Sequence, residues 1–401
     1  MDPSRFYINE YSSSNEEIEL LSSLQNNLDE RISIISSEIF HYYNDRHDGS
    51  LYSGSLCKVY LLYQLNRLHE ASRHVLPYIS QSDNRVTLLE GRKVGALAMS
   101  CAIHYKLKDD TILKDHLDML LNVYDYVHSE LPEQECDVMY GRAGFLHAIL
   151  FVRKEIGDEM YGKEQVLQIL MDILQEGIKN KTEHFPLLWK WHQKIYLGSA
   201  HGVAGILQTL LSFNDEVCLL GRRSDHDYMN DIHGTIRSLL SVKFLSGNIP
   251  SSIGKERDNL VQWCHGAPGL ILLLVKAYEV FDEVDHLKQA CDIAFNVVWT
   301  RGLLRKGMGL CHGISGNAYS FLALHRGLNT FRQRGGDIQD KDIEIWLYRC
   351  WKFVEFVFQH QQELQRIPDH PYSLFEGLGG FCCLINDLKA PTGSHFPLFE
   401  F

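Results

Sequence analysis

The spacing of apolar residues along the chain predicts a protein built mainly from amphipathic helices. Between residues 14 and 40, apolar positions recur at steps of three and four, and Ser14 and Glu17 form a capping-box pattern near the start. Similar spacing recurs over 112–129, 163–180, 228–242, 283–299 and 342–360. Alternating patterns typical of half-buried strands are scarce. We therefore predict an all-α protein.

A short glycine-containing signature recurs along the chain and predicts a repeat architecture. Each copy consists of a residue pair, then Gly-x-x-Gly, then an apolar run. The seven copies lie near 52–57, 90–95, 140–144, 200–205, 264–269, 311–316 and 375–380. Their ends are about 38 to 64 residues apart, which is enough for two helices per copy. A closed ring of seven helical hairpins, about fourteen helices, satisfies this spacing, and an open solenoid is the alternative.

Several charged stretches are predicted to be surface loops, namely 81–84, 222–227 and 332–340. None of them is long enough to be a convincing linker between domains. We therefore expect one domain over residues 1–401, with residues 1–13 as a flexible N-terminus.

Composition and charge exclude several functional classes. The 401 residues carry a net charge of −12, with 45% hydrophobic and 22% charged residues, which is typical of a folded globular protein. The acidic balance argues against nucleic acid as a partner. The N-terminus lacks a signal-peptide pattern, and the apolar run 270–275 is too short to cross a bilayer. We expect a cytoplasmic protein with free cysteines, which could also lie peripherally at the plasma membrane or in the nucleus.

Residues with ligand and acid–base chemistry precede the glycines of the signature: Tyr140, His201, Cys264, His265, Cys311, His312 and Glu376. Two matching Cys-His-Gly copies could place two thiolates and one imidazole at one point, a donor set that Zn²⁺ favours. We predict one zinc ion bound by Cys264, Cys311 and His312, with His265 nearby but not bound. An inert buried cysteine beside a helix-capping histidine explains a single pair better, but the repetition favours a metal site.

A zinc ion with two thiolate ligands and an open position is suited to binding a thiol substrate as a nucleophilic thiolate. Thiol addition or alkylation is therefore the predicted chemistry, although hydrolysis by a zinc-bound water is an alternative. His201 could transfer a proton, and a hydrogen-bonded helix-cap histidine is the equally weighted alternative. Asp137 could orient His201, or it could be a solvated loop carboxylate.

Basic residues near these motifs are candidates for binding an anionic group of a substrate. Lys306 lies five residues before Cys311 and could neutralise a carboxylate or phosphate. Arg142 and Arg366 are further candidates. Exposed basic residues are usually solvated, and that interpretation remains the alternative for each of them.

The chain resembles the lanthionine synthetase cyclase family, LanC, and more closely its eukaryotic LanC-like branch. The most specific matches are Ala200-His201-Gly202, the segment from Trp263 to Gly269, the segment from Lys306 to Gly313, and the segment from Ser373 to Gly377. The resemblance extends from Gly49 to Glu400. It implies a double-layered α/α toroid of seven helical hairpins, with zinc held by Cys264, Cys311 and His312.

The resemblance also implies a reaction. In bacterial LanC enzymes a peptide cysteine adds to dehydroalanine or dehydrobutyrine, and the residues matching His201 and Asp137 transfer protons. Eukaryotic LanC-like proteins instead bind glutathione and add it to dehydroamino acids that are left in proteins when phosphate is eliminated. Lys306 and the segment Arg366-Ile367-Pro368-Asp369 are similar to positions that contact glutathione, and Arg5 matches another contact more weakly.

Two copies depart from the family pattern. Cys57 replaces the second glycine of the first copy, and the glycines of 90–95 are one residue too far apart. Both copies are distant in sequence from the zinc motifs, so the departures bear on the mouth and on substrate choice more than on metal binding.

Three functional hypotheses follow. The first is a zinc-dependent transferase that uses glutathione as co-substrate and formerly phosphorylated proteins or peptides as acceptors. The second is a non-catalytic zinc and glutathione sensor, or an adaptor for kinases or receptors, although pure binding needs neither His201 nor Asp137. The third is a glycosidase-like toroid with Asp137 and Glu376 as paired carboxylates, which would leave the two Cys-His pairs without a purpose.

Overall fold

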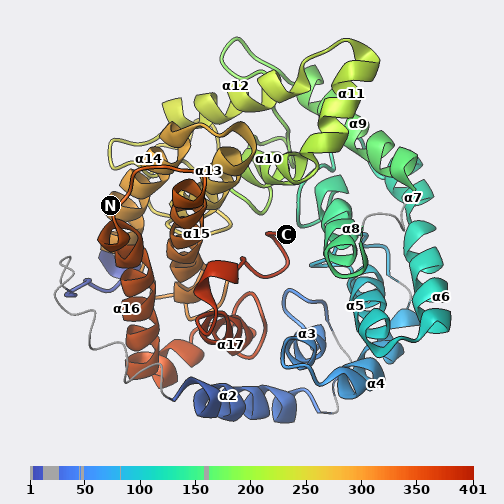
Figure 1. Ribbon diagram of the computed structural model, residues 1–401, viewed down its shortest axis with the longest axis vertical. Helices are drawn as coiled ribbons and strands as arrows, with labels where there is room; N and C mark the ends of the chain where they lie inside the picture. Colours follow the sequence, from blue (N-terminus) through green and yellow to red (C-terminus); the bar gives the residue numbers. More distant parts are fainter. Residues whose placement is uncertain (1–2, 12–26, 45, 47–48, 82, 158–161) are drawn as a thin grey trace. The chain divides into compact units, whose positions relative to one another are not determined.

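The regular secondary structure of the protein is helical. The computed structural model describes residues 3–11, 27–44, 46, 49–81, 83–157 and 162–401. Within this part of the chain there are helices and isolated β-bridges but no strand (Figure 1). The predicted all-α class is therefore confirmed.

Two compact units make up the fold. Unit 1 comprises Met1–Asn44, Lys243–Ser251 and Lys255–Glu400, and unit 2 comprises Asp45–Val242, Ser252–Gly254 and Phe401. The single domain expected over residues 1–401 stays a prediction.

Unit 2 consists of helices that pack on their neighbours in the sequence. They are α3 (Leu56–Gln64), α4 (Leu68–Ile79), α5 (Arg92–Leu107), α6 (Asp110–Leu121), α7 (Tyr124–Ser129), α8 (Arg142–Ile156), α9 (Lys163–Lys179), α10 (Val203–Ser212), α11 (Asn214–Ser224) and α12 (Tyr228–Ser241). Helix α5 packs against α4, α6 and α8, and α10 packs against α8, α11 and α12. Such local packing is expected for a chain of helical hairpins.

Unit 1 contains the remaining helices. They are η1 (Pro3–Arg5), α2 (Leu28–Tyr42), α13 (Ala267–Phe281), α14 (Val284–Ile293), the π-helical segment η4 (Ala294–Trp299), α15 (Ile314–Gln333), α16 (Asp340–Gln365), α17 (Leu378–Asp387) and η5 (Pro391–Gly393). Helix α15 packs against α13, α14, α16 and α17. Helix α17 packs against α2, so segments from the two ends of the chain meet within this unit.

Every copy of the glycine signature begins a helix, and these seven helices are called the turn helices: α3, α5, α8, α10, α13, α15 and α17. The first glycine of the signature is the N-cap residue of six of them, namely Gly91, Gly141, Gly202, Gly266, Gly313 and Gly377. In the first copy Ser55 takes that position.

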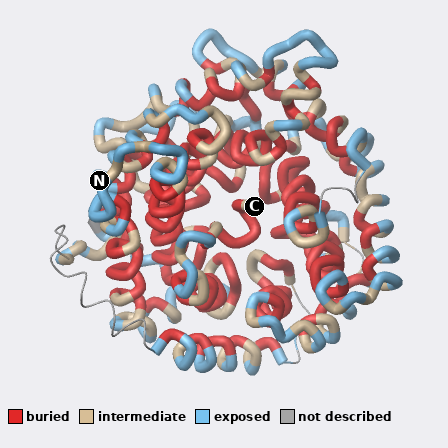
Figure 2. The backbone as a smooth tube through the Cα atoms, viewed as in Figure 1, coloured by how far each residue is buried: buried red, intermediate tan, exposed pale blue. Residues whose placement is uncertain are grey.

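The turn helices are buried along most of their length, whereas their partners bury one face. All residues of 203–211 in α10 and of 378–385 in α17 are buried. In α6 only Leu113, Leu117 and Leu120 are buried, at the spacing of one helix face (Figure 2). The predicted amphipathic spacing therefore belongs to the partner helices, and the turn helices are buried on all sides over most of their length.

Close approach of two backbone segments requires the second glycine of the signature. A Cβ added at Gly316 would lie 1.8 Å from the carbonyl oxygen of Leu310. The corresponding distances are 2.1 Å from Gly144 to Val138, 2.0 Å from Gly205 to Ser199 and 2.4 Å from Gly380 to Leu374. In the second copy, Gly95 makes the same contact with the carbonyl oxygen of Leu88, at 2.7 Å. The wider glycine spacing of that copy thus preserves the contact.

Most of the predicted helices agree with the structure. Helices α9, α12 and α16 occupy the predicted ranges 163–180, 228–242 and 342–360. Of the helix predicted over 14–40, α2 covers the part from Leu28, and Ser14 and Glu17 lie outside the described residues.

Two predicted helices differ in detail from the structure. The range 112–129 is divided between α6 and α7, because the N–H of Val123 bonds to the carbonyl of Leu120 and tightens the last turn. The range 283–299 changes from α-helix to π-helix at Ala294.

Residues 3–11 form defined contacts with the rest of unit 1. The N–H of Tyr7 donates to the carbonyl of Leu303 at 2.7 Å, and its hydroxyl donates to Glu363 at 2.6 Å. The side-chain amide of Asn9 donates to the carbonyl of Trp299 at 2.6 Å. The described part of the segment 1–13, which the sequence suggests is flexible, is therefore hydrogen-bonded.

The length and apolar composition of the described helices bear on whether any of them could cross a membrane. None of them is by itself both long and apolar enough to cross a bilayer. Helices α10 and α11 meet the length and composition criteria only together, as a pair bent by 86°.

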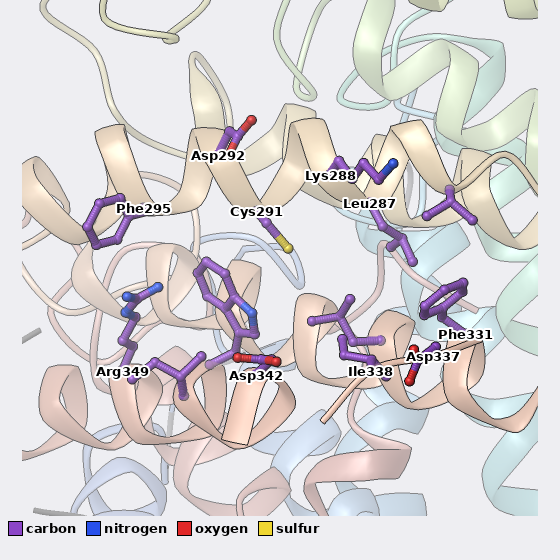
Figure 3. Close-up of a pocket in the computed structure, with 14 residues that line it drawn as sticks. Leu287, Lys288, Cys291, Asp292, Phe295, Phe331, Asp337, Ile338, Asp342 and Arg349 are labelled. Atoms are coloured by element: carbon purple, nitrogen blue, oxygen red, sulfur yellow. The ribbon is translucent and has the colours of Figure 1, made fainter. Parts of the chain in front are cut away.

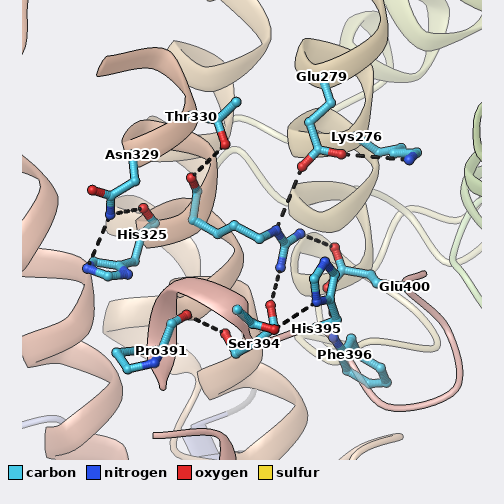
Figure 4. Close-up of polar contacts among 12 residues, drawn as sticks. Lys276, Glu279, His325, Asn329, Thr330, Pro391, Ser394, His395, Phe396 and Glu400 are labelled. Carbon is cyan, nitrogen blue, oxygen red and sulfur yellow. Dashed lines mark hydrogen bonds and ion pairs between the residues drawn. The ribbon is translucent and has the colours of Figure 1, made fainter. Parts of the chain in front are cut away.

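A buried arginine anchors the C-terminal segment to α15. Arg326 donates to the carbonyl of Ser394 and to the carboxylate of Glu400, both at 2.6 Å, and its Nε lies 3.7 Å from Glu279 (Figure 4). Burial alone would raise the pKa of Glu400, but the Arg326 charge lowers it. The ion pair therefore favours the charged carboxylate in the folded state.

We expect Gly316→Ala to destabilise the protein by about 1–3 kcal/mol, since the added methyl group must displace the Leu310 carbonyl. Denaturant unfolding measures the change. Gly393→Ala is the control, because no atom lies within 4 Å of its Cβ position. Equal stability of the two variants would contradict the close-approach argument.

We expect Arg326→Met to destabilise the protein by about 3–5 kcal/mol, because it leaves the Glu400 carboxylate buried without its partner. Since the folded pKa of Glu400 is lowered, the stabilisation is complete above the ordinary glutamate pKa of about 4.3 and is lost as the pH falls through the lowered value. The difference in melting temperature between wild type and variant should therefore become smaller as the pH is lowered from 7 to 3. Thermal unfolding at a series of pH values measures this difference. A pH-independent difference would be evidence against the ion pair.

Candidate functional site

Two cysteines and a histidine form a compact donor cluster in unit 1. Cys264, Cys311 and His312 each offer one ligand atom, and these atoms all lie within 4.8 Å of one another. The two cysteines are 6% and 4% exposed. The three residues are called the triad.

Backbone hydrogen bonds between successive turns hold the triad. The N–H of Cys264 donates to the carbonyl of Cys311 at 3.3 Å, and the N–H of Cys311 donates to the carbonyl of Phe375 at 2.8 Å. The side-chain amide of Gln262 donates to the Cys264 sulfur at 3.1 Å. Because the turns before α13, α15 and α17 are linked in this way, residues 47 positions apart in the sequence become neighbours.

The Cys264 sulfur of the triad differs chemically from the other buried thiols. Hydrogen bonding with Cys311 and His312 holds the pKa of the Cys264 thiol well below its usual value, against the effect of burial. Burial lowers the pKa of His312, but the adjacent Cys264 sulfur outweighs it and raises that pKa. In contrast, burial raises the pKa of Cys101 and of Cys382 to about 12. The triad therefore favours a thiolate where ordinary buried cysteines are neutral.

The donor set of the triad fits a zinc ion. Sulfur and nitrogen ligands at 2.0–2.3 Å from a tetrahedral centre lie roughly 3.5–3.8 Å apart, and the ligand atoms of the triad all lie within 4.8 Å of one another. Two soft thiolates and one imidazole are ligands that zinc prefers, and three protein donors leave one tetrahedral position open. His265 lies in the same turn, and its charge also lowers the pKa of Cys264, but its ring is not part of the cluster.

His201 and Asp137 form a hydrogen-bonded pair in unit 2. The Nδ1 of His201 lies 3.1 Å from one Asp137 oxygen. The other oxygen accepts from the N–H groups of Tyr140 and Gly141, at 2.6 and 3.2 Å. Asp137 is 2% exposed, so it is an orienting carboxylate and not a solvated one. The bond to Asp137 holds the imidazole ring of His201 in one orientation.

An aromatic stack supports His201, and the sequence interpretation did not include it. The Trp191 ring lies parallel to the imidazole with a centroid distance of 4.0 Å, and the Tyr140 ring lies at 5.5 Å. Trp191 sits in a tight turn closed by its β-bridge with Lys194. The only signal in the sequence is an aromatic residue ten positions before the histidine, which by itself indicates no contact.

The predicted anion-binding positions lie on two adjacent loops of unit 1. Gly307 has a positive φ of 102°, and a Cβ there would lie 3.2 Å from the ring of Pro368. The loop of Lys306 therefore packs on the segment 366–369, and both Lys306 and Arg366 are exposed. The Lys306 charge also acts on His312, which puts this loop close to the triad.

Arg142 has a structural role that differs from the one suggested by its charge. It is 3% exposed and donates to the carbonyls of Leu131 and Pro132, at 2.9 and 2.8 Å. These bonds hold the loop that leads to Asp137. Arg142 therefore has its guanidinium buried against this loop.

Comparisons with known proteins extend these observations. A family model described as lanthionine synthetase C-like protein matches residues 45–401. A Danio rerio protein named glutathione S-transferase LANCL1 is 33% identical over 343 residues, which cover 82% of this chain and 78% of that protein. An Arabidopsis thaliana protein named LanC-like protein GCL1 is 39% identical over 269 residues, which cover 66% of this chain and 57% of that protein.

A solved structure gives independent information on the fold. Nisin cyclase matches with a TM-score of 0.60 and 15% sequence identity, over 92% of this chain and 95% of that chain. At this identity the likeness bears on the fold alone, and it confirms the predicted α/α toroid class. Since the family model covers most of the sequence, the chain belongs to the lanthionine synthetase C-like family.

Proposed function

We propose that this protein is a zinc-dependent transferase that adds the thiol of glutathione to dehydroalanine or dehydrobutyrine residues of proteins. The observation that carries this proposal is the triad of Cys264, Cys311 and His312, whose donor set fits a zinc ion with one open position. The name of the Danio rerio relative supports glutathione as the co-substrate. The acceptors would be proteins or peptides from which phosphate has been eliminated.

In the proposed reaction, some residues of the chain bind the substrates and others transfer the proton. When bound to the triad, zinc would supply a Lewis-acid position that lowers the pKa of a substrate thiol. Lys306 and Arg366 bind the carboxylates of glutathione, and Ile367, Pro368 and Asp369 complete that side of the site. In the net reaction the S–H bond and the Cα=Cβ π bond of the dehydroamino acid are lost, and an S–Cβ bond and a Cα–H bond form. His201 donates the proton to Cα, and Asp137 holds the imidazole in orientation.

A cationic cavity adds support for an anionic substrate. Arg5, Lys255 and Arg257 line a cavity of about 190 Å³ in unit 1 together with Leu260. The carbonyl oxygen of Leu260 lies 2.3 Å from the Cβ position of Gly266, two residues after Cys264. The cavity is therefore next to the turn that carries the triad, where a carboxylate of glutathione would be attracted.

The alternative is a non-catalytic zinc and glutathione sensor, or an adaptor for kinases or receptors. The hydrogen bond between His201 and Asp137 argues against it, because binding alone requires no oriented imidazole. The glycosidase hypothesis is less favoured still, since both oxygens of Asp137 are engaged in hydrogen bonds.

We expect one zinc ion per chain in the purified protein and its loss in Cys311→Ala, because two remaining donors bind zinc weakly. Elemental analysis measures the stoichiometry. Cys382→Ala is the matched control, since Cys382 is equally buried and lies outside the triad. Equal zinc in both variants would show that the triad is not the metal site.

We expect His201→Ala to slow glutathione addition to a dehydroalanine peptide by about 10²–10⁴-fold, with zinc content unchanged. Mass spectrometry measures the adduct. His226→Ala is the control, because His226 makes a similar but exposed pair with Asp231, at 2.7 Å. Bound zinc and glutathione without any acceleration in the wild type would favour the sensor or adaptor instead.

A further inference from the structure

A second cavity in unit 1 has the size and walls of a small-molecule site. It has a volume of about 560 Å³ and lies between α14 with η4 on one side and α15 with α16 on the other (Figure 3). Its apolar walls include Leu287, Phe295, Leu328, Phe331 and Trp346, and no residue of the triad lines it. Ligand sites commonly measure about 300–1,000 Å³ and are mostly apolar with a few polar groups.

The unusual polar group of this cavity is Arg349. It is 6% exposed, and its guanidinium lies 4.5 Å from the Trp346 ring centroid and 4.9 Å from that of Phe295. Figure 3 shows its side chain extending from α16 toward Phe295. Among the residues that the structure describes, none forms a hydrogen bond or ion pair with Arg349, and its Nε is a buried donor without an acceptor. Buried charges in proteins are normally paired, so this cation lacks an anion.

The surroundings of Arg349 do not compensate its charge. Burial lowers the pKa of Arg349 to about 10, which reflects the missing partner. Burial raises the pKa of the neighbouring Cys291 thiol to about 12, so this sulfur is uncharged at neutral pH. Asp292, Asp337 and Asp342 also line the cavity, but all three are exposed and water screens their charges.

The backbone beside the cavity is irregular. Phe295 belongs to the π-helical segment Ala294–Trp299, and so does Trp299, whose ring centroid lies 5.5 Å from the Arg349 guanidinium. Phe295 is 43% exposed, although it is a large apolar side chain. Short π-helical segments occur frequently at functional sites. The segment thus presents two aromatic rings to one unpaired cation.

We propose that this cavity binds a small organic monocarboxylate with an apolar body. The carboxylate pairs with Arg349, and the apolar body packs among Leu287, Leu328 and Phe331. An arginine fork matches the two oxygens of a carboxylate, and the exchange of a buried unpaired charge for an ion pair favours binding. One guanidinium matches one carboxylate, whereas a phosphate with two negative charges would leave one of them without a buried partner, which is why a carboxylate is favoured over a phosphate.

Calorimetric titration of the full chain with decanoate, and with decanol as its uncharged counterpart, tests the proposal. We expect Arg349→Met to weaken decanoate binding by about tenfold or more and to leave decanol binding unchanged. Arg237→Met is the control, because Arg237 is exposed on α12 outside the cavity. Equal affinities of the wild type for decanoate and decanol, or no decanoate binding at all, would overturn the proposal.

Two further variants test whether the ligand lies in this cavity and not at the triad, and they do so without relying on the Arg349 substitution alone. Val284→Trp fills the cavity from α14 without touching Arg349, so we expect it to weaken decanoate and decanol alike by about tenfold or more. Unchanged decanoate affinity in a folded Val284→Trp protein would place the ligand elsewhere. Cys311→Ala should keep wild-type decanoate affinity, and a loss there would assign the carboxylate to the triad and overturn the proposal.

Discussion

The close contact between the backbone of a turn and its own helix, present at five of the seven turns, is the constraint on which the rest of the structure depends. At Gly316 the helix backbone approaches the Leu310 carbonyl so closely that a methyl group has no room. This contact holds the loop tightly over the helix entry and leaves the N–H and carbonyl of Cys311 directed at the neighbouring turns. Turns linked in this way convert a regular sequence repeat into a regular arrangement of side chains. The positions of the triad residues are therefore fixed by the backbone, and a largely buried helix follows each of their turns.

The His201–Asp137 pair is also held by the backbone of a turn, together with neighbouring side chains. The N–H groups of Tyr140 and Gly141, in the turn before α8, donate to Asp137 and hold the carboxylate that bonds to His201. Arg142, the first residue of that helix, is directed away from the pair and holds the preceding loop through its carbonyls. Trp191 covers one face of the imidazole. The pair thus has one orientation, which proton transfer at a defined substrate atom requires.

Two buried arginines of unit 1 illustrate how the same residue type serves different purposes. Arg326 is surrounded by acceptors, including the Glu400 carboxylate, and therefore stabilises the C-terminal segment. Arg349 has aromatic rings around it and no acceptor among the described residues. Aromatic faces compensate a desolvated guanidinium only in part, since they accept no strong hydrogen bond. The difference in surroundings separates a structural ion pair from a cation that is available to a ligand.

The sequence by itself determined the helical class, the seven turns and the residues that come together as the triad. Apolar spacing reports helix faces, and matching positions in consecutive repeats must be neighbours, so Cys264 and Cys311 were predictable as a pair. Only the tertiary structure decided that Trp191 stacks on His201, that Arg142 is buried in a loop and that Arg349 lacks an anion. The physical reason is that these properties depend on which side chains from separate segments meet. Local helix propensity and apolar periodicity carry no information about which side chains from separate segments come into contact.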